Sequence, residues 1–314
     1  MLARFRRQGL AQGWVAIAPL GNRARVACVA ASEAGRPRVQ WTLETPWDQP
    51  LAALREIKAR LGRGASTPLV VLLERGRYQM LPMEAPAVPP EEWRQAARWQ
   101  IKQMVDYPIE TAAVDILTIP AHVTQRGQAS LIAVAAPREA MQALVNTAHE
   151  AGVCLQALDV AETALRNVSG LLEEPGRGQA LLHVGASHST LVVTAGGELL
   201  LSRAMEVSLA QLTHPDADIR QQAFERTSLE LQRTLDSFER VFSQVSLSRV
   251  LVTPAQAVED FLTYLRELIY VPVTALDLGA AFDLAGVPEV AADPQLQSQC
   301  LAAFGAALRP GAAA

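Results

Sequence analysis

The sequence predicts an α/β protein of two lobes, each of which begins with a β-hairpin. Near the start, β-rich runs at residues 14–18 and 25–31 are joined by a Pro-Leu-Gly-Asn segment with turn chemistry. In the second half, Val- and Leu-rich runs at 180–184 and 190–194 flank a small-residue turn that begins at Gly185. Runs this short, bounded by Gly and Ser, are typical of strands in a meander. We therefore interpret the chain as a coarse duplication of one unit.

The first half continues as a strand, a helix and two more strands. Residues 38–43 favour a third strand. A helix begins at Pro50 and ends at Gly62, and its apolar residues recur at helical spacing, namely Leu51, Leu54, Ile57 and Leu61. Runs at 69–73 and 78–81 are expected to be strands. We assign residues 1–83 to the first lobe.

A proline-rich shift in composition over residues 84–90 predicts a subdomain inserted into the first lobe, spanning 84–155. Pro90 and the two glutamates after it form a favourable helix start, and Tyr107-Pro108 ends this helix at about residue 106. Two strands, a helix that begins at Pro137 and a last strand complete the unit, and the strands span 113–119, 130–135 and 153–158.

The remaining chain is expected to cross over and build the second lobe. Residues 156–175 return to the first lobe and include a crossing helix at 161–172. The second lobe spans 176–310, and residues 311–314 form a tail. After the third strand of its meander (198–202), a long helix at 216–244 carries an apolar stripe over five turns, made of Phe224, Leu231, Leu235, Phe238 and Phe242. Further strands at 249–253 and 271–276 and a final helix at 296–308 follow.

Composition narrows the functional class. The net charge is −4, which gives no reason to expect nucleic acid as a partner. The three cysteines, Cys28, Cys154 and Cys300, are far apart and favour a reducing, cytoplasmic setting without a disulfide framework or zinc site. We expect neither a signal peptide nor a transmembrane helix, and we interpret Arg4, Arg6 and Arg7 as part of a solvated tail.

Three stretches together resemble one family. Residues 84–120 (EAPAVPPEEWRQAARWQIKQMVDYPIETAAVDILTIP), 131–167 (LIAVAAPREAMQALVNTAHEAGVCLQALDVAETALRN) and 228–238 (SLELQRTLDSF) are similar to PilM-type type IV pilus assembly proteins. Within that family the chain looks most like the MshI proteins of MSHA-type (mannose-sensitive hemagglutinin) pili. The resemblance implies a two-lobed actin-like fold, a duplicated ribonuclease H-like unit with an inserted PilM/FtsA-type subdomain.

The same resemblance implies a place and a partner. PilM-type proteins sit in the cytoplasm, peripheral to the inner membrane. There they bind the N-terminal cytoplasmic tail of a PilN-like single-pass membrane protein, in a groove between the first lobe and the inserted subdomain, and they meet other pilus platform or motor components. We therefore expect a binding protein of this kind.

An active ATPase of this fold needs two phosphate loops that each carry an Asp, and a Gly-rich adenosine loop. Here the corresponding residues are Ala18, Pro19 and Gly21 in the first loop, His183, Gly185 and Ser187 in the second, and Thr253 and Pro254 in the third. Pro19 lacks an amide donor, His183 stands in place of the Asp, and Pro254 stands where relatives carry Gly. We expect a vestigial nucleotide site, no catalysis, no ATP or Mg²⁺ as cofactor, and no metal at His183 and His188.

Two other functions stay open. A working ATPase or sugar/acetate-type kinase would need carboxylates from elsewhere, such as Asp159 or Glu162. The cytoplasmic domain of a GspL-like type II secretion protein would continue into a transmembrane helix, whereas this sequence ends in Arg-Pro-Gly-Ala-Ala-Ala.

Aromatic side chains at the start of the inserted subdomain are the candidates for partner binding. The residues of this predicted surface are Trp93, Arg94, Trp99, Met104 and Tyr107. Trp41 and Trp47 of the first lobe are weaker candidates for the opposite wall of the groove. Packing of this helix within its own subdomain is the alternative interpretation for each residue.

Overall fold

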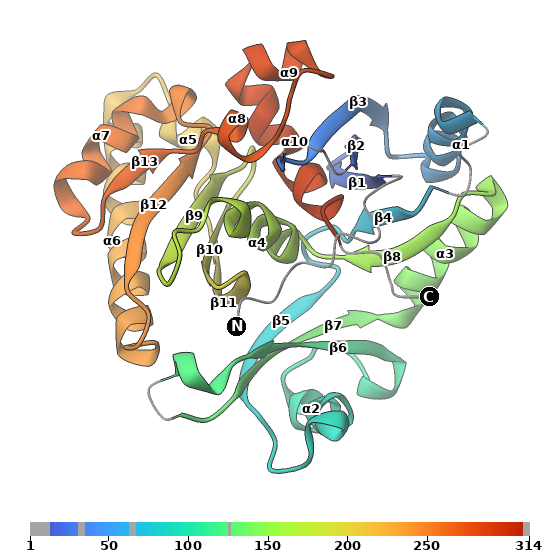
Figure 1. Ribbon diagram of the computed structural model, residues 1–314, viewed down its shortest axis with the longest axis horizontal. Coiled ribbons are helices and arrows are strands. Elements are labelled where there is room, and N and C mark those ends of the chain that lie inside the picture. The colour runs from blue at the N-terminus through green and yellow to red at the C-terminus, as the bar shows by residue number, and fades with distance from the viewer. Residues whose placement is uncertain (1–12, 31–34, 63–66, 125–126, 310–314) are drawn as a thin grey trace.

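The computed structural model describes residues 13–30, 35–62, 67–124 and 127–309 (Figure 1). The predicted tail at 311–314 and the arginines at 4, 6 and 7 lie outside these residues. The described chain forms two five-stranded sheets and a three-stranded sheet, joined by helices.

The first sheet has the strand order β3-β2-β1-β4-β8. Its strands are β1 (Trp14–Leu20), β2 (Arg23–Ala30), β3 (Arg38–Pro46), β4 (Leu69–Leu72) and β8 (Leu155–Asp159). The first three are antiparallel, and β4 and β8 run parallel to β1. The hairpin is tighter than expected, because Pro19 pairs with Ala24 within the ladder. Only Gly21 and Asn22 remain as the turn, and Gly21 has φ of 67°.

The second sheet repeats this plan in the order β11-β10-β9-β12-β13. Its strands are β9 (Gly178–Val184), β10 (Ser189–Ala195), β11 (Glu198–Met205), β12 (Leu247–Thr253) and β13 (Val273–Ala275). Again the first three are antiparallel and the last two run parallel to the first. Two identical topologies in one chain confirm the predicted duplication of the two-lobed fold.

The third sheet, β5-β7-β6, belongs to the insertion. It consists of β5 (Gln79–Glu84), β6 (Ala112–Ile119) and β7 (Ser130–Pro137). The helix expected over 90–106 is divided into a 3-10 turn η3 (Pro90–Glu92), α2 (Trp93–Gln100) and a second 3-10 turn η4 (Ile101–Gln103). Ile101 is fully buried where α2 ends, and η5 (Ile109–Thr111) leads into β6.

The edges of the insertion differ from the predicted 84–155. The strand expected at 78–81 starts the inserted sheet as β5. At the other end, α3 (Arg138–Ala151) packs on α1 (Pro50–Leu61), and its Ala148 and Ala151 lie in the first-lobe core with Ile57. Because β8 pairs with β4, the expected last strand of the insertion is instead the edge of the first sheet.

Helices α4 (Ala161–Leu172) and α10 (Pro294–Ala306) pack against each other between the lobes. Helix α4 lies on the second sheet, and α10 lies on β1 and β2 of the first. At the start of α4, the Asp159 carboxylate accepts from the amide of Val160 and from the hydroxyl of Thr163. Asp293 caps α10 by accepting from the amides of Gln295 and Leu296. The lobes therefore exchange helices across their boundary, and one apolar core runs through both.

The other helices are those of the second lobe. They are α5 (Leu209–Leu212), α6 (Ala217–Val241), α7 (Glu259–Leu268), α8 (Leu278–Ala281) and α9 (Pro288–Ala292), with the 3-10 turn η7 (Gln256–Val258) before α7. A further 3-10 turn, η6 (Ala121–Val123), belongs to the insertion. The apolar stripe of α6 is buried as predicted, for example at Leu231, Leu235 and Phe238. After β13 the chain crosses back, and Asp283 bridges Arg38 at the edge of β3. None of the described helices is both long and apolar enough to span a bilayer.

Candidate functional site

The turn between β9 and β10 is the second of the predicted phosphate loops. The amide of Gly185 donates to the carbonyl of His188 at 3.0 Å, and its own carbonyl accepts from the amide of Leu209 at 2.8 Å. A Cβ on Gly185 would come 2.5 Å from that His188 oxygen, so the turn itself requires glycine. The amide that a phosphate loop would present to an oxyanion is therefore used inside the protein.

His183, which ends β9 next to this turn, makes a specific long-range contact. Its Nε2 lies 3.1 Å from the backbone carbonyl oxygen of Ser298 in α10. Burial and, to a smaller extent, the neighbouring His188 lower the pKa of His183 to about 4, against the bond to Ser298, which raises it. The imidazole is therefore neutral at pH 7, with its Nε2–H donating to the carbonyl.

Thr253, Pro254, Ser187 and His188 gather at the same end of the second sheet. Thr253 is 4% exposed and pairs with His183 in the β9–β12 register. Ser187 Oγ lies 3.0 Å from His188 Nδ1. Burial lowers the pKa of His188, and so does the positive charge of Arg75, which lies in the loop after β4. Sequence reasoning did not find Arg75.

The first-loop residues lie on the other sheet. Ala18 is 2% exposed and pairs with Arg25, while Pro19 extends β1 and Gly21 is at the exposed tip of the hairpin. Helix α10 packs on this hairpin and also bonds to His183 through Ser298. The structure therefore brings the second and third loops together and places α10 against both hairpins.

The two carboxylates that an active enzyme could recruit both have partners. Asp159 Oδ2 accepts from Arg309 Nη1 at 2.6 Å, and its Oδ1 accepts from the amide of Val160 at 2.9 Å. Glu162 Oε2 accepts from Tyr78 Oη at 2.6 Å. Arg309 and Tyr78 were not predicted by the sequence, since each partner lies far along the chain.

The predicted partner surface divides into exposed and packed side chains. Trp99 is 62% exposed and Met104 is 49% exposed, and Arg94 is also exposed. The ammonium of Lys102 lies 5.9 Å from the centre of the Trp99 ring, a cation–π contact. Trp93 is half-buried and donates its Nε1–H to the carbonyl of Val88 at 3.0 Å.

Tyr107 packs at the edge of the inserted core. Burial raises the pKa of its hydroxyl, and Asp106 adds to this. Among the described residues that hydroxyl is buried without a hydrogen-bond partner. Gln79 donates its side-chain NH2 to Asp106, the residue before Tyr107, at 3.3 Å. The side-chain oxygen of Gln79 is, like the Tyr107 hydroxyl, buried without a hydrogen-bond partner.

The first-lobe tryptophans do not form an open wall. Trp47 is 7% exposed and belongs to the first-lobe core, which corrects its assignment as a groove residue. Trp41 is partly buried, and the guanidinium of Arg60 lies 4.9 Å from its ring centre. Residue spacing could not separate these packed rings from accessible ones, because both kinds lie on strands or strand ends.

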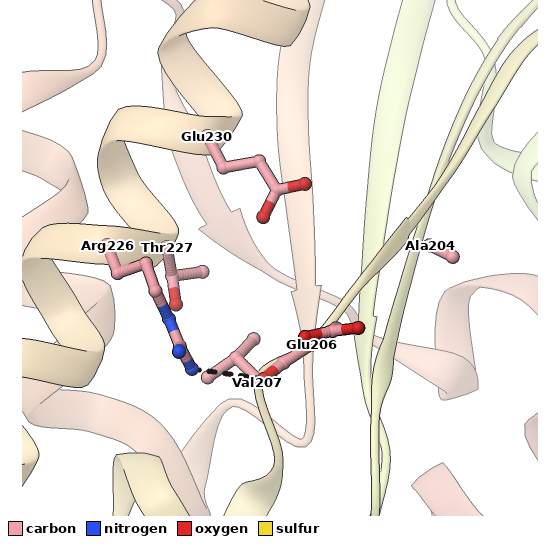
Figure 2. Close-up of a pocket in the computed structure, with 6 residues that line it drawn as sticks. All are labelled: Ala204, Glu206, Val207, Arg226, Thr227 and Glu230. Carbon is pink, nitrogen blue, oxygen red and sulfur yellow. Dashed lines mark hydrogen bonds between the residues drawn. The ribbon is translucent and has the colours of Figure 1, made fainter.

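A pocket of about 310 Å³ lies in the second lobe between the end of β11 and α6 (Figure 2). Arg226 and Thr227 of α6 line it, and Arg226 donates to the carbonyl of Glu206 at 3.0 Å. Glu230, on the same helix face, pairs with Arg203 at 3.2 Å. One of the two lining glutamates, Glu230, is thus paired with an arginine through its carboxylate, whereas Arg226 bonds only to the backbone of Glu206. The sequence contained no signal for this pocket.

Comparison with known proteins identifies the fold. No family model matches the chain, and no curated protein matches it. Among solved structures, the chain is similar to one described as a PilM–PilN type IV pilus biogenesis complex, with a TM-score of 0.68 and 22% identity over 95% of this chain and 98% of that chain. This likeness confirms the predicted two-lobed actin-like fold.

Two more distant similarities have lower scores. One is to a Bacteroides thetaiotaomicron protein with an actin-like ATPase fold, with a TM-score of 0.49 and 11% identity over 92% of this chain and 98% of that chain. The other is to the cytoplasmic domain of EpsL, an inner-membrane component of the Vibrio cholerae type II secretion system. Its TM-score is 0.43, with 13% identity over 63% of this chain and 71% of that chain.

Proposed function

We propose that this protein is a non-catalytic, actin-like scaffold of a type IV pilus assembly platform, of the MSHA type. It works in the cytoplasm at the inner membrane, where it binds the cytoplasmic tail of a PilN-like single-pass assembly protein. The observation that supports this most is the likeness to the PilM–PilN structure, which extends over 95% of the chain. The sequence resemblance of the inserted subdomain to the same family is a second, separate support.

The residues at the predicted nucleotide loops, and the two carboxylates that could serve them, support the absence of catalysis. A carboxylate that orients water or holds Mg²⁺ has to be free to bind it. Asp159 and Glu162 are bonded to Arg309 and Tyr78, and a neutral imidazole occupies the position of the missing Asp. The Gly185 amide is also engaged within its turn.

The exposed part of the inserted subdomain is where we place the tail. Trp99 offers a large, rigid apolar ring to a partner, and Met104 adds an adaptable apolar side chain. Arg94 and Lys102 are exposed on the same segment. Tyr107 supports this surface by packing on the core beneath α2, and Trp93 is held by its bond to the Val88 carbonyl.

Titration of a synthetic peptide tests this function. The peptide is the cytoplasmic N-terminal tail of a PilN-like single-pass protein from the same genome. We expect saturable binding to the full chain, and Trp99→Ala should weaken it by about tenfold or more, because a central Trp is a typical hot spot. Tyr270→Ala, which truncates a 55% exposed aromatic in the second lobe, is the matched control and should bind as the parent does.

A parent chain that does not bind the tail would remove the proposed function. Equal affinity of the Trp99→Ala and Tyr270→Ala variants would instead remove the proposed surface. Isothermal titration with Mg-ATP tests the lack of catalysis separately. We expect no saturable heat and no phosphate release, and micromolar binding with measurable turnover would contradict the proposal.

A further inference from the structure

The inserted subdomain is part of the first lobe by its covalent connections. The chain leaves the first sheet after β4, forms β5, β6 and β7, and returns through α3 and β8. Both strands that bracket the excursion, β4 and β8, lie side by side in the first sheet. In Figure 1 the inserted sheet nevertheless extends beneath both lobes, with α2 on its far side.

The two faces of this sheet pack against different partners. Met83 and Ile116 face the small core beneath α2, together with Ile101 and Ile109. Met80 and Leu117 point to the opposite face and pack on the core that runs through both lobes. Ile132, at 1% exposure, belongs to that same core. Alternation along β5 and β6 thus divides the side chains between a local core and the interlobe core.

The opposite face meets the second lobe directly. Strand β6 packs along β11, the edge strand of the second sheet. Ser202 of β11 has its hydroxyl 4.0 Å from the sulfur of Met80, and Leu199 and Leu200 of β11 are buried in the shared core. The insertion is therefore joined to one lobe by the chain and to the other by packing.

The base of the insertion is also tied to the crossing helix. Tyr78, which immediately precedes β5, donates its hydroxyl proton to Glu162 in the first turn of α4. Burial raises the pKa of Tyr78, and the Glu162 carboxylate raises it further, so the donor stays protonated. Because α4 packs on β10 and β11, this bond links the base of the insertion to the helix that lies on the second sheet.

We infer that the inserted subdomain is an interlobe clamp. Lobes of a two-lobed protein can rotate about the few segments that cross between them. Helices α4 and α10 already connect the lobes. Here the face of the inserted sheet that carries Met80 and Leu117 adds a third connection by packing on the second lobe, and this connection holds the lobes in one relative orientation. A partner that displaces the insertion therefore also changes the interlobe geometry. This property does not depend on the proposed function.

Pulsed electron paramagnetic resonance on the full chain tests the clamp. Spin labels are attached at Ala59→Cys, exposed on α1, and Ser237→Cys, exposed on α6. Cys28 and Cys300 are buried, so only Cys154, which is partly accessible, is replaced, by Cys154→Ser. We expect one narrow interlobe distance in this parent and its loss, by broadening or a shift, in the double variant Met80→Ser, Leu117→Ser.

The matched control is the double variant Met83→Ser, Ile116→Ser, which removes the same kinds of side chain from the face beneath α2. It should keep the narrow parent distance. A folded Met80→Ser, Leu117→Ser protein with the parent distance would overturn the inference, and so would equal broadening in both double variants. If the first double variant does not fold, Met80→Ala alone is measured, with the same two outcomes.

Discussion

His183 makes a contact that an aspartate at the same position could not make. Its Nε2–H donates to the Ser298 carbonyl of α10, a contact 115 residues apart in sequence. A carboxylate at this position would place its oxygen, an acceptor, against the Ser298 carbonyl oxygen, which is also an acceptor. In a partly buried site this would raise the free energy of the folded protein. The histidine is thus compatible with the position of α10, and an aspartate is not.

The depressed pKa of His183 predicts a pH dependence of stability. The folded value is about 4, below the ordinary value of 6.5, so between these pH values the unfolded chain binds more protons than the folded one. The contribution of His183 to the free energy of unfolding is complete above about pH 6.5. It is lost as the pH falls to about 4, which lowers the free energy of unfolding by up to about 3 kcal/mol. Urea unfolding at several pH values between these limits measures it.

His183→Asn keeps a donor for the Ser298 carbonyl but does not titrate, which makes it the matched variant. The parent should be more stable relative to this variant at pH 7.5 than at pH 4.5, because groups common to both proteins cancel in the difference. A difference in unfolding free energy that stays constant with pH would contradict the neutral, buried imidazole.

At the scale of elements, the crossing of α4 and α10 depends on one glycine. A Cβ on Gly305 would lie 2.0 Å from the carbonyl oxygen of Ala164, and Asn167 donates to the Gly305 carbonyl at 2.9 Å. Backbone atoms of one helix therefore touch the other, and neither helix can retreat without leaving the core between the lobes.

Gly305→Ala should destabilise the protein by about 3 kcal/mol through overpacking at this crossing. Gly170→Ala is the control in the same helix pair. Its Cβ would meet the Cα of Gly197 at 3.5 Å, an ordinary contact, so the helix propensity of alanine should stabilise by about 0.5–1 kcal/mol. Denaturant midpoints compare the two variants. If Gly305→Ala is as stable as the parent, the close crossing is wrong.

The boundaries of the insertion show where pattern reasoning stops at this scale. A helix that begins at Pro137 was predicted, but a local pattern does not say which sheet that helix covers. In the structure Ala148 and Ala151 are buried in the first-lobe core, while Val145 of the same helix is 43% exposed. The sheet that a helix covers is set by the order of strands β4 and β8, which is a long-range property.

At the scale of the whole molecule, the continuous interlobe core predicts that the lobes unfold together. The five tryptophans test this, because all of them lie in the first 99 residues, at positions 14, 41, 47, 93 and 99. Tryptophan fluorescence therefore reports only the first lobe and the insertion, whereas far-ultraviolet circular dichroism reports every helix. The two signals should give one coincident transition in urea.

Separate transitions would show that the second lobe unfolds independently, in spite of its shared core. The Met80→Ser, Leu117→Ser variant extends the comparison. Because it weakens the packing of the insertion on the second lobe, we expect the two signals to separate in this variant and to remain coincident in Met83→Ser, Ile116→Ser.

The sequence by itself determined the order of the strands and long helices, the two hairpins and the duplication, because hydrophobic period and turn residues act over a few positions. The short helices α5, α8 and α9 were not predicted. The hypothesis that His183, Pro19 and Pro254 depart from the pattern of an active nucleotide site came from the sequence resemblance. Only the tertiary structure decided the partners of those residues and of their neighbours. Ser298 accepts from His183, Arg309 neutralises Asp159 across 150 residues, and Met80 reaches β11. Each of these contacts depends on which elements the fold brings together, and no local pattern encodes that.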